Sequence, residues 1–238
     1  SSQFSSADLT LTGDVGIGVA PTTSYGRVAQ IHDTGTSGAN LRLTDSTSSA
    51  GTGNGFEIIQ LGVNSYLINR ETGFMSIYTS GTEAMKIDAN GHITKPLQSA
   101  FLVTKNSSQT DTAIDTNVTV TFDTERFDQN GDFASNTFTA PVTGRYQLNA
   151  IVYTSDAPTD LHYFTIRIVT SNRTYYAIFD PGQAGLTGAN AYHTLHINVL
   201  ADMDASDTAY VNFYTPSGTA QTNIDGYHTS SFSGFLAC

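Results

Sequence analysis

The apolar segments in the first part of the chain are only a few residues long, and Gly-, Ser- and Thr-rich turns separate them. A hairpin made of such pieces is only marginally stable by itself in water. Another chain must therefore supply the missing cover. Three identical chains around one axis meet this need, because each contributes one wall of a shared core. The sequence predicts that residues 1–96 form the β-rich shaft of a homotrimeric fibre. The segments are 9–11, 15–19, 41–43, 56–61, 66–68, 74–78 and 85–87.

The rest of the chain has longer segments in which apolar and polar residues alternate. This alternation is typical of strands with one buried face, and repeated strands of this spacing in residues 97–238 favour a two-sheet jelly roll. No window of a dozen residues keeps a helical apolar period without a Gly or turn cluster. We therefore expect an all-β chain. The clearest alternations are Val118, Val120, Phe122; Tyr146, Leu148, Ala150, Val152; Phe164, Ile166, Ile168; Leu195, Ile197, Val199; and Val211, Phe213.

Charge and composition exclude several classes of partner. The 10 basic against 21 acidic residues give a formal net charge of −11, which argues against nucleic acid and anionic membranes as partners. No apolar run approaches the roughly 20 residues of a transmembrane helix, so we expect no membrane insertion. The lone cysteine, Cys238, excludes an internal disulfide and a multi-cysteine zinc site.

Several motifs of the second part occur in an order that resembles the C1q-like head domain of the complement and tumour-necrosis-factor superfamily. The resemblance covers about residues 98–238 and implies a jelly-roll head that forms homotrimers. It also leaves open a calcium ion on the threefold axis, held by one Asp per subunit; otherwise we expect no cofactor. The motifs are Phe122-Asp123, the run from Asn136 to Tyr146 and the run from Ser230 to Leu236.

The first part resembles the shaft segments of bacteriophage fibre and tailspike-like proteins. Together with the head, this resemblance implies a virion appendage that carries a knob on a shaft, with the N-terminal side joined to other virion proteins. We therefore expect the protein in the virion. The motifs lie at residues 13–18, 41–46, 66–71 and 85–93.

Candidate chemical motifs do not favour an enzyme. There is no Gly-x-Ser-x-Gly elbow, and the only thiol ends the chain. A glycan-cleaving pair of carboxylates is an arrangement in space that the sequence leaves open. Asp202, Asp204 and Asp207 lie in a turn, where Asp is favoured for its hydrogen bonds to the backbone, and we expect no metal there. In a strand His193 and His196 point to opposite faces, so we expect His193 to be a hydrogen-bonded core histidine.

The loops at one end of the head are the candidate binding site. Counted back from the last strand, segments 155–160, 180–190 and 215–229 fall at the end far from the shaft, and long loops on a rigid scaffold often carry binding residues. Amide, carboxylate and phenol groups suit a hydroxyl-rich glycan; the alternative is that they only close turns. The candidates are Asp156, Asp160, Gln183, Asn190, Gln221, Asn223, Asp225, Tyr227 and His228.

Three tyrosines alternate with apolar residues and are candidates for the trimer interface. Tyr210 and Tyr214 flank Val211 and Phe213, and Tyr192 has the parity opposite to Leu195. Rings left in water by a monomer would be buried between subunits in a trimer. The sequence leaves open which face of each strand forms the core.

The function that we expect is host attachment. The predicted protein is a homotrimeric phage fibre, of tail or capsid, whose knob binds a glycan or protein on the host surface; three copies would turn weak sites into avidity. One alternative is a structural decoration or connector of the virion without receptor binding. Another is a secreted bacterial adhesin with the same head.

Overall fold

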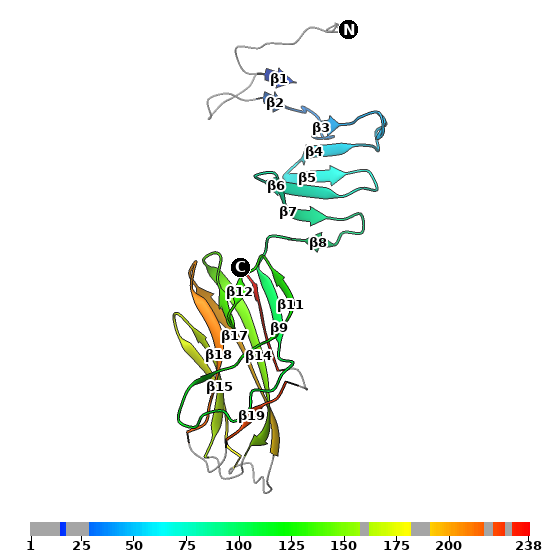
Figure 1. Ribbon diagram of the computed structural model, residues 1–238. Helices are drawn as coiled ribbons and strands as arrows, with labels where there is room; N and C mark the ends of the chain where they lie inside the picture. The colour runs from blue at the N-terminus through cyan, green and yellow to red at the C-terminus, as the bar shows by residue number, and fades with distance from the viewer. Residues whose placement is uncertain (1–14, 18–28, 158–161, 182–190, 217–220, 227–229) are drawn as a thin grey trace. The chain divides into compact units, whose positions relative to one another are not determined.

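The computed structural model describes residues 15–17, 29–157, 162–181, 191–216, 221–226 and 230–238 (Figure 1). Its elements are all strands, which confirms the predicted all-β class. No helix suited to spanning a membrane is found in these residues. The chain separates into two compact units, Ser1–Thr94 and Lys95–Cys238, which are described in turn. The predicted border lies between residues 96 and 97.

The first unit consists of small, thin sheets. Two short strands pair in parallel, and two antiparallel sheets of three strands follow along the chain. The strands are β1 (Val15–Ile17) with β2 (Ala29–Ile31); β3 (Ala39–Leu43), β4 (Phe56–Leu61) and β5 (Asn64–Asn69); and β6 (Met75–Thr79), β7 (Thr82–Ile87) and β8 (Ile93–Thr94).

The register puts apolar side chains on one face of each three-stranded sheet. Leu41, Ile58 and Leu67 are opposite one another in β3–β5, and all three side chains are exposed. A hollow lined by residues of both sheets, including Leu67 and Ile77, joins the two apolar faces. We call this surface the apolar wall; its members are Leu41, Leu43, Phe56, Ile58, Leu67, Met75, Ile77, Met85, Ile87 and Ile93.

A buried carboxylate, rather than a hydrophobic cluster, is the best-enclosed side chain of this unit. Glu57 is 0% exposed and accepts hydrogen bonds from Asn40 and Arg42 of β3 and from Arg70, which follows β5. Its ion pairs measure 2.5 Å to Arg42 and 2.8 Å to Arg70. The hydrogen bonds from Asn40 and Arg42, followed by Arg70, lower the pKa of Glu57 to about 2. Glu57 therefore ties the three strands together on the face opposite the apolar wall.

The second unit is a sandwich of two six-stranded antiparallel sheets, as the two-sheet prediction requires. One sheet, the β14 sheet, has the order β11-β9-β20-β14-β17 with β19 beside β14; the other, the β18 sheet, has the order β12-β13-β18-β15-β16 with β10 beside β18. The strands are β9 (Ala100–Thr104), β10 (Val118–Thr119), β11 (Thr124–Gln129), β12 (Phe133–Ala134), β13 (Thr137–Thr139), β14 (Gly144–Ala157), β15 (Phe164–Thr170), β16 (Thr174–Phe179), β17 (Ala191–Met203), β18 (Thr208–Tyr214), β19 (Asn223–Ile224) and β20 (Ser231–Leu236).

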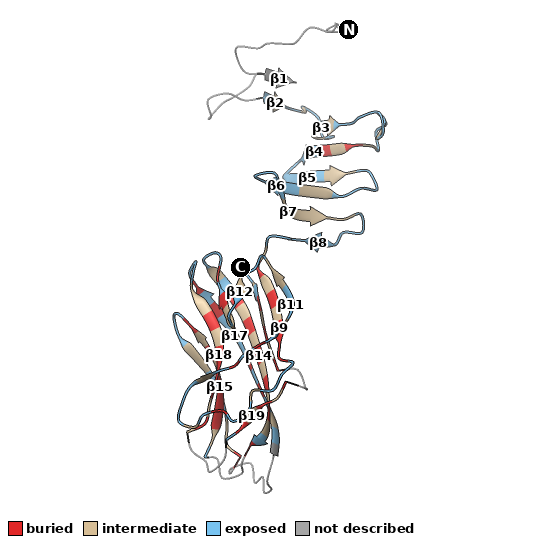
Figure 2. Ribbon diagram, in the orientation of Figure 1, coloured by how far each residue is buried: buried red, intermediate tan, exposed pale blue. Residues whose placement is uncertain are grey.

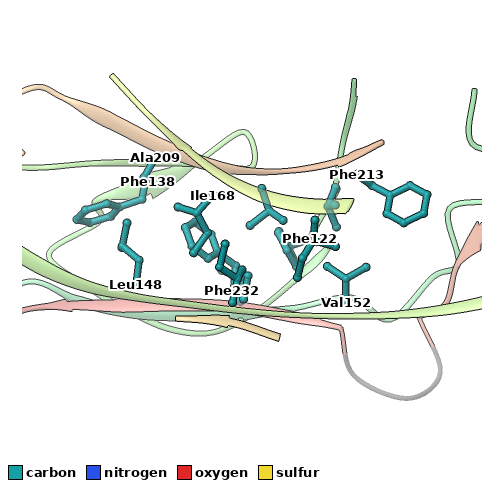
Figure 3. Close-up of a cluster of buried hydrophobic side chains, with 14 of the residues drawn as sticks. Phe122, Phe138, Leu148, Val152, Ile168, Ala209, Phe213 and Phe232 are labelled. Carbon is teal, nitrogen blue, oxygen red and sulfur yellow. The ribbon is translucent and has the colours of Figure 1, made fainter. Parts of the chain in front are cut away.

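The hydrophobic core lies between these two sheets (Figure 3). Along β14 every second side chain from Tyr146 to Val152 is fully buried, as the alternation predicts. Aromatic rings fill the centre: Phe101 stacks on Phe138 at 4.7 Å and meets Phe232 edge-on at 5.0 Å. Among the described residues, every buried hydrophobic side chain belongs to this unit. Figure 2 shows most of the buried segments here, with red also on β4, the strand of the buried Glu57.

Candidate functional site

The chain enters the sandwich and ends at the same end of it, and the opposite end is formed by other segments. At one end the side chain of Gln129 donates to the carbonyls of Lys95 and Pro96, where the chain enters the unit. The C-terminus lies at the same end, because the amide of Arg145 donates to the carbonyl of Cys238 at 2.7 Å. β14 runs from this entry end to the opposite, far end, which β19 and the neighbouring segments form (Figure 1).

Four of the predicted ligand residues meet at the far end. Asn223 of β19 pairs with Ser155, and its side-chain amide donates to Asp156 at 2.8 Å. The amide of Gln221 donates to the carbonyl of Asp111 at 2.8 Å, and the backbone of Asp225 donates to Tyr153. The structure thus brings Asp156, Gln221, Asn223 and Asp225 together. The other five candidates, Asp160, Gln183, Asn190, Tyr227 and His228, lie outside the described residues.

The polar groups of this cluster are engaged largely with each other. The carbonyl oxygen of the Asn223 side chain accepts from the amide of Asp111 at 2.9 Å, so both ends of this side chain have protein partners. The side-chain amide of Gln221 likewise donates to the backbone carbonyl of Asp111. For these two residues the hydrogen bonds join far-end segments that are distant in the chain, and ligand binding by them stays a prediction.

The segment between β9 and β10 is part of the far end, although sequence reasoning did not select it. Asp123 accepts the amides of Asn106 at 2.6 Å and Ser107 at 2.8 Å. Burial by itself raises the pKa of Asp123, but these hydrogen bonds outweigh it and lower the value to about 2. A Cβ on Gly226 would lie 2.6 Å from the backbone of Asn106 and Ser107, so this contact requires glycine. The polar run from Lys105 to Thr112 gave no sequence signal for this path.

Tyr192 lies near the far end on the outer face of the β14 sheet and is 65% exposed. Its ring stacks on that of Tyr153 at 5.9 Å. Burial, followed by the charge of Asp225 and by Tyr192, raises the pKa of Tyr153. The same sheet exposes three further large apolar side chains, Phe127, Leu200 and Phe235.

Tyr210 and Tyr214 lie on the other sheet. Because Val211 and Phe213 are fully buried, the two tyrosines point outward from the β18 sheet and are half-buried. This settles which face of β18 forms the core. A cyclic trimer uses two different surfaces of each subunit, so tyrosines on opposite sheets are compatible with one ring of contacts. The burial of all three rings between subunits stays a prediction.

The histidine and aspartate motifs have structural surroundings. His193 packs against Phe179 at 4.8 Å and Phe164 at 5.4 Å, and burial lowers its pKa. The expected hydrogen bond is wrong for its Nε2 atom, which is buried without a partner in the described part of the chain. Asp207 closes its turn by accepting from the amide of Asp204. No group of three or more His, Cys, Asp or Glu side chains suited to a metal occurs among the described residues.

Among the comparisons with known proteins, only solved structures show similarity to this chain. No protein-family model matches the chain, and no curated protein matches it. The globular domain of zebrafish complement 1qA matches with a TM-score of 0.44 and 17% identity over 59% of this chain and 98% of that one. A crystal structure of murine APRIL at pH 8.0 matches with a TM-score of 0.42 and 12% identity over 58% and 98%. These are globular domains of the C1q and tumour-necrosis-factor types.

Proposed function

We propose that this chain is a homotrimeric bacteriophage fibre protein whose C-terminal sandwich attaches the virion to the host cell surface. The observation that carries the proposal is the contrast in burial. The second unit encloses a core, whereas the described part of the first buries only Gly55 and Glu57 and exposes the apolar wall. A wall of this extent is typical of a surface that another chain covers.

Three copies of the chain would cover this wall by turning it toward a common axis. Each sheet then supplies one side of a shared core, which removes its apolar residues from water. In the second unit the outer face of the β14 sheet, with Tyr192, Leu200 and Phe235, offers a further contact between copies. The placement in a virion rests on the resemblance of the first part to phage fibre shafts.

The sandwich would then present its far end, away from the chain entry, to the host. Three copies of one weak site gain avidity when their spacing fits the target, by roughly 10²- to 10⁴-fold. We propose binding without catalysis, with a surface glycan as the target. An axial calcium ion would take one Asp from each of three subunits, and it stays an expectation from the resemblance.

One observation favours a second candidate, a structural decoration or connector of the virion. The side-chain amides of Asn223 and Gln221 form hydrogen bonds within the chain, as expected if the far end has only a structural role. Host binding does not need these two residues if its contacts come from other parts of the surface.

Cell labelling distinguishes the two candidates. The full chain, fluorescently labelled, is incubated with a panel of bacterial isolates, and bound fluorescence is measured against a chain denatured beforehand. Attachment predicts saturable labelling of some isolates and competition with phage infection of those isolates. Absence of labelling across isolates that the phage infects would overturn attachment and leave the structural candidate.

A further inference from the structure

The outer face of the β18 sheet carries a single charged side chain. In the register of β15, β16 and β18, Arg167 lies opposite Asn212 on one side and Tyr176 on the other, which defines the outward positions. Apart from Arg167, the outward positions of these three strands hold Thr, Val, Ile, Asn and Tyr, and none holds Asp or Glu. We call this surface the Arg167 face.

Arg167 is held between two aromatic rings. The centre of its guanidinium group lies 5.0 Å from the ring centroid of Tyr176 and 4.5 Å from that of Tyr214. Its Nε donates to Thr165 at 3.1 Å, and one terminal nitrogen donates to the side chain of Asn117. Such contacts stabilise a cation on an aromatic face and fix the plane of the guanidinium group. The group is therefore ordered before any ligand arrives.

No carboxylate neutralises this arginine within the part of the chain that the structure describes. The ion pairs found there involve Arg42, Arg70, His92 and Arg173. Arg173, in the turn between β15 and β16, pairs with Asp202 at 2.6 Å. Guanidinium has five N–H donors, and the hydrogen bonds of Arg167 occupy two of them. In a chain with a net charge of −11, an arginine without an acidic partner leaves its charge for a ligand.

We propose that the Arg167 face binds an acidic saccharide through a carboxylate or sulfate group. A planar guanidinium group matches both anions with two parallel hydrogen bonds. Beside it, Tyr176 is 56% and Ile178 65% exposed, which gives a flat apolar surface for the C–H groups of a sugar ring. The exposed Asn117 and the half-buried Thr174 can hydrogen-bond hydroxyl groups, whereas Thr165 and Asn212 are buried. This inference rests on the proposed attachment function and names its ligand class.

A second copy of the chain is the competing occupant of this face, because Tyr210 and Tyr214 are also interface candidates. Tyr192 and Leu200 of the other sheet are exposed to the same extent as Ile178 and Tyr176, so that sheet offers assembly an apolar surface of its own. The Arg167 face has a charge and hydroxyl groups that a glycan uses and that an apolar subunit contact does not need. The experiment below separates the two occupants by mass.

The test is a titration of the full chain with defined glycans. The charged groups of oligogalacturonate are carboxylates, those of dextran sulfate are sulfates, and neutral dextran is the uncharged control. Binding is measured by calorimetry at low salt. We expect one or both acidic probes to bind and dextran not to bind. Arg167→Gln should weaken this binding about tenfold or more, and Tyr176→Ala by a similar factor. The matched control Arg173→Gln, at the end of the same hairpin, should change it less than about twofold, because Arg173 is already paired with Asp202.

Each variant is also checked for its mass by light scattering and for its thermal unfolding. Unchanged affinity in Arg167→Gln, binding of neutral dextran as tight as that of the acidic probes, or no binding of either acidic probe would overturn the inference. A lower oligomer mass in Arg167→Gln would overturn it as well, by making the face a contact between copies. Tyr176→Ala provides the test should Arg167→Gln unfold, because its side chain is largely exposed.

Glycan titration and cell labelling together distinguish failure of this inference from failure of the proposed attachment function. If the full chain labels cells and Arg167→Gln labels them equally, the ligand class is wrong and attachment stands. If acidic probes bind through Arg167 while no cell is labelled, the site exists and attachment fails.

Discussion

The two units are built from the same kind of polar, glycine-punctuated β sequence, yet they solve the problem of burial differently. In the first unit no described strand is longer than six residues, and its sheets have an exposed apolar wall. In the second, two six-stranded sheets face each other and enclose a core between them. A second sheet facing the first is therefore what lets one copy of the chain cover its own apolar residues. Under the proposed function, further copies of the chain supply the core that one copy of the first unit lacks.

The largest effect is expected when charged residues are placed in the apolar wall, because the copies should then no longer assemble. The double variant Leu67→Asp, Ile77→Asp places carboxylates in the surface that we expect the copies to share, where burial of an unpaired charge is strongly unfavourable. We expect the trimer to dissociate to single chains, measured by sedimentation velocity. Tyr66→Asp, on the opposite face of β5, is the matched control and should keep the trimer. A double variant that stays trimeric would place the contact elsewhere.

The next effect concerns the second unit, which should depend on its own core. Phe138 is fully buried and contacts Phe101 and Tyr146, so Phe138→Ala should lower the free energy of unfolding by about 3–5 kcal/mol. Chemical denaturation followed by tyrosine fluorescence measures it. Thr139→Ala, on the exposed side of the same strand, should stay within about 0.5 kcal/mol. Equal changes in the free energy of unfolding for Phe138→Ala and Thr139→Ala would mean that the core does not stabilise this sandwich.

Acid should loosen the first unit through Glu57. Its pKa is about 2 in the folded chain against an ordinary 4.5, so the folded state binds fewer protons than the unfolded state. The stabilisation is complete above pH 4.5 and is lost as the pH falls toward 2. The protection of β3, β4 and β5 amides, relative to their intrinsic exchange rate at each pH, should therefore fall over this range. Glu57→Gln should raise exchange at neutral pH and flatten the pH dependence; an unchanged profile would count against the Glu57 cluster as the tie between strands.

The smallest effect is a pH dependence of the second unit at milder acidity. Burial lowers the pKa of His193 below its ordinary 6.5, so the unfolded state binds more protons and stability falls as the pH drops below 6.5. Thermal unfolding between pH 7 and 5 should show this slope, and His193→Leu should reduce it. If the variant keeps the full slope, another group causes it.

Much of the second unit could be predicted from its sequence, because period-two alternation fixes which side chains are buried. Tyr146, Leu148, Ala150 and Val152 are buried as predicted. Sequence left open which face of β18 forms the core, since Val211 and Tyr210 are both apolar enough for either side. Packing decided it in favour of Val211.

Features that depend on register between distant segments could not be predicted. The enclosure of Glu57 needs Arg42 and Arg70 from neighbouring strands, and the place of Arg167 between Tyr176 and Tyr214 needs three strands in one alignment. Alternation within one segment carries no information on these pairings. Asp156 and Asn223 lie together at the far end, but their mutual hydrogen bond could not be foreseen from the sequence.

The central claim is that one copy of this chain leaves an apolar wall that only further copies cover. The most direct test is the mass of the full chain in solution, measured by sedimentation equilibrium across micromolar concentrations. Our account predicts three times the chain mass of 25.4 kDa throughout this range. A stable, soluble species with the mass of a single chain would contradict it.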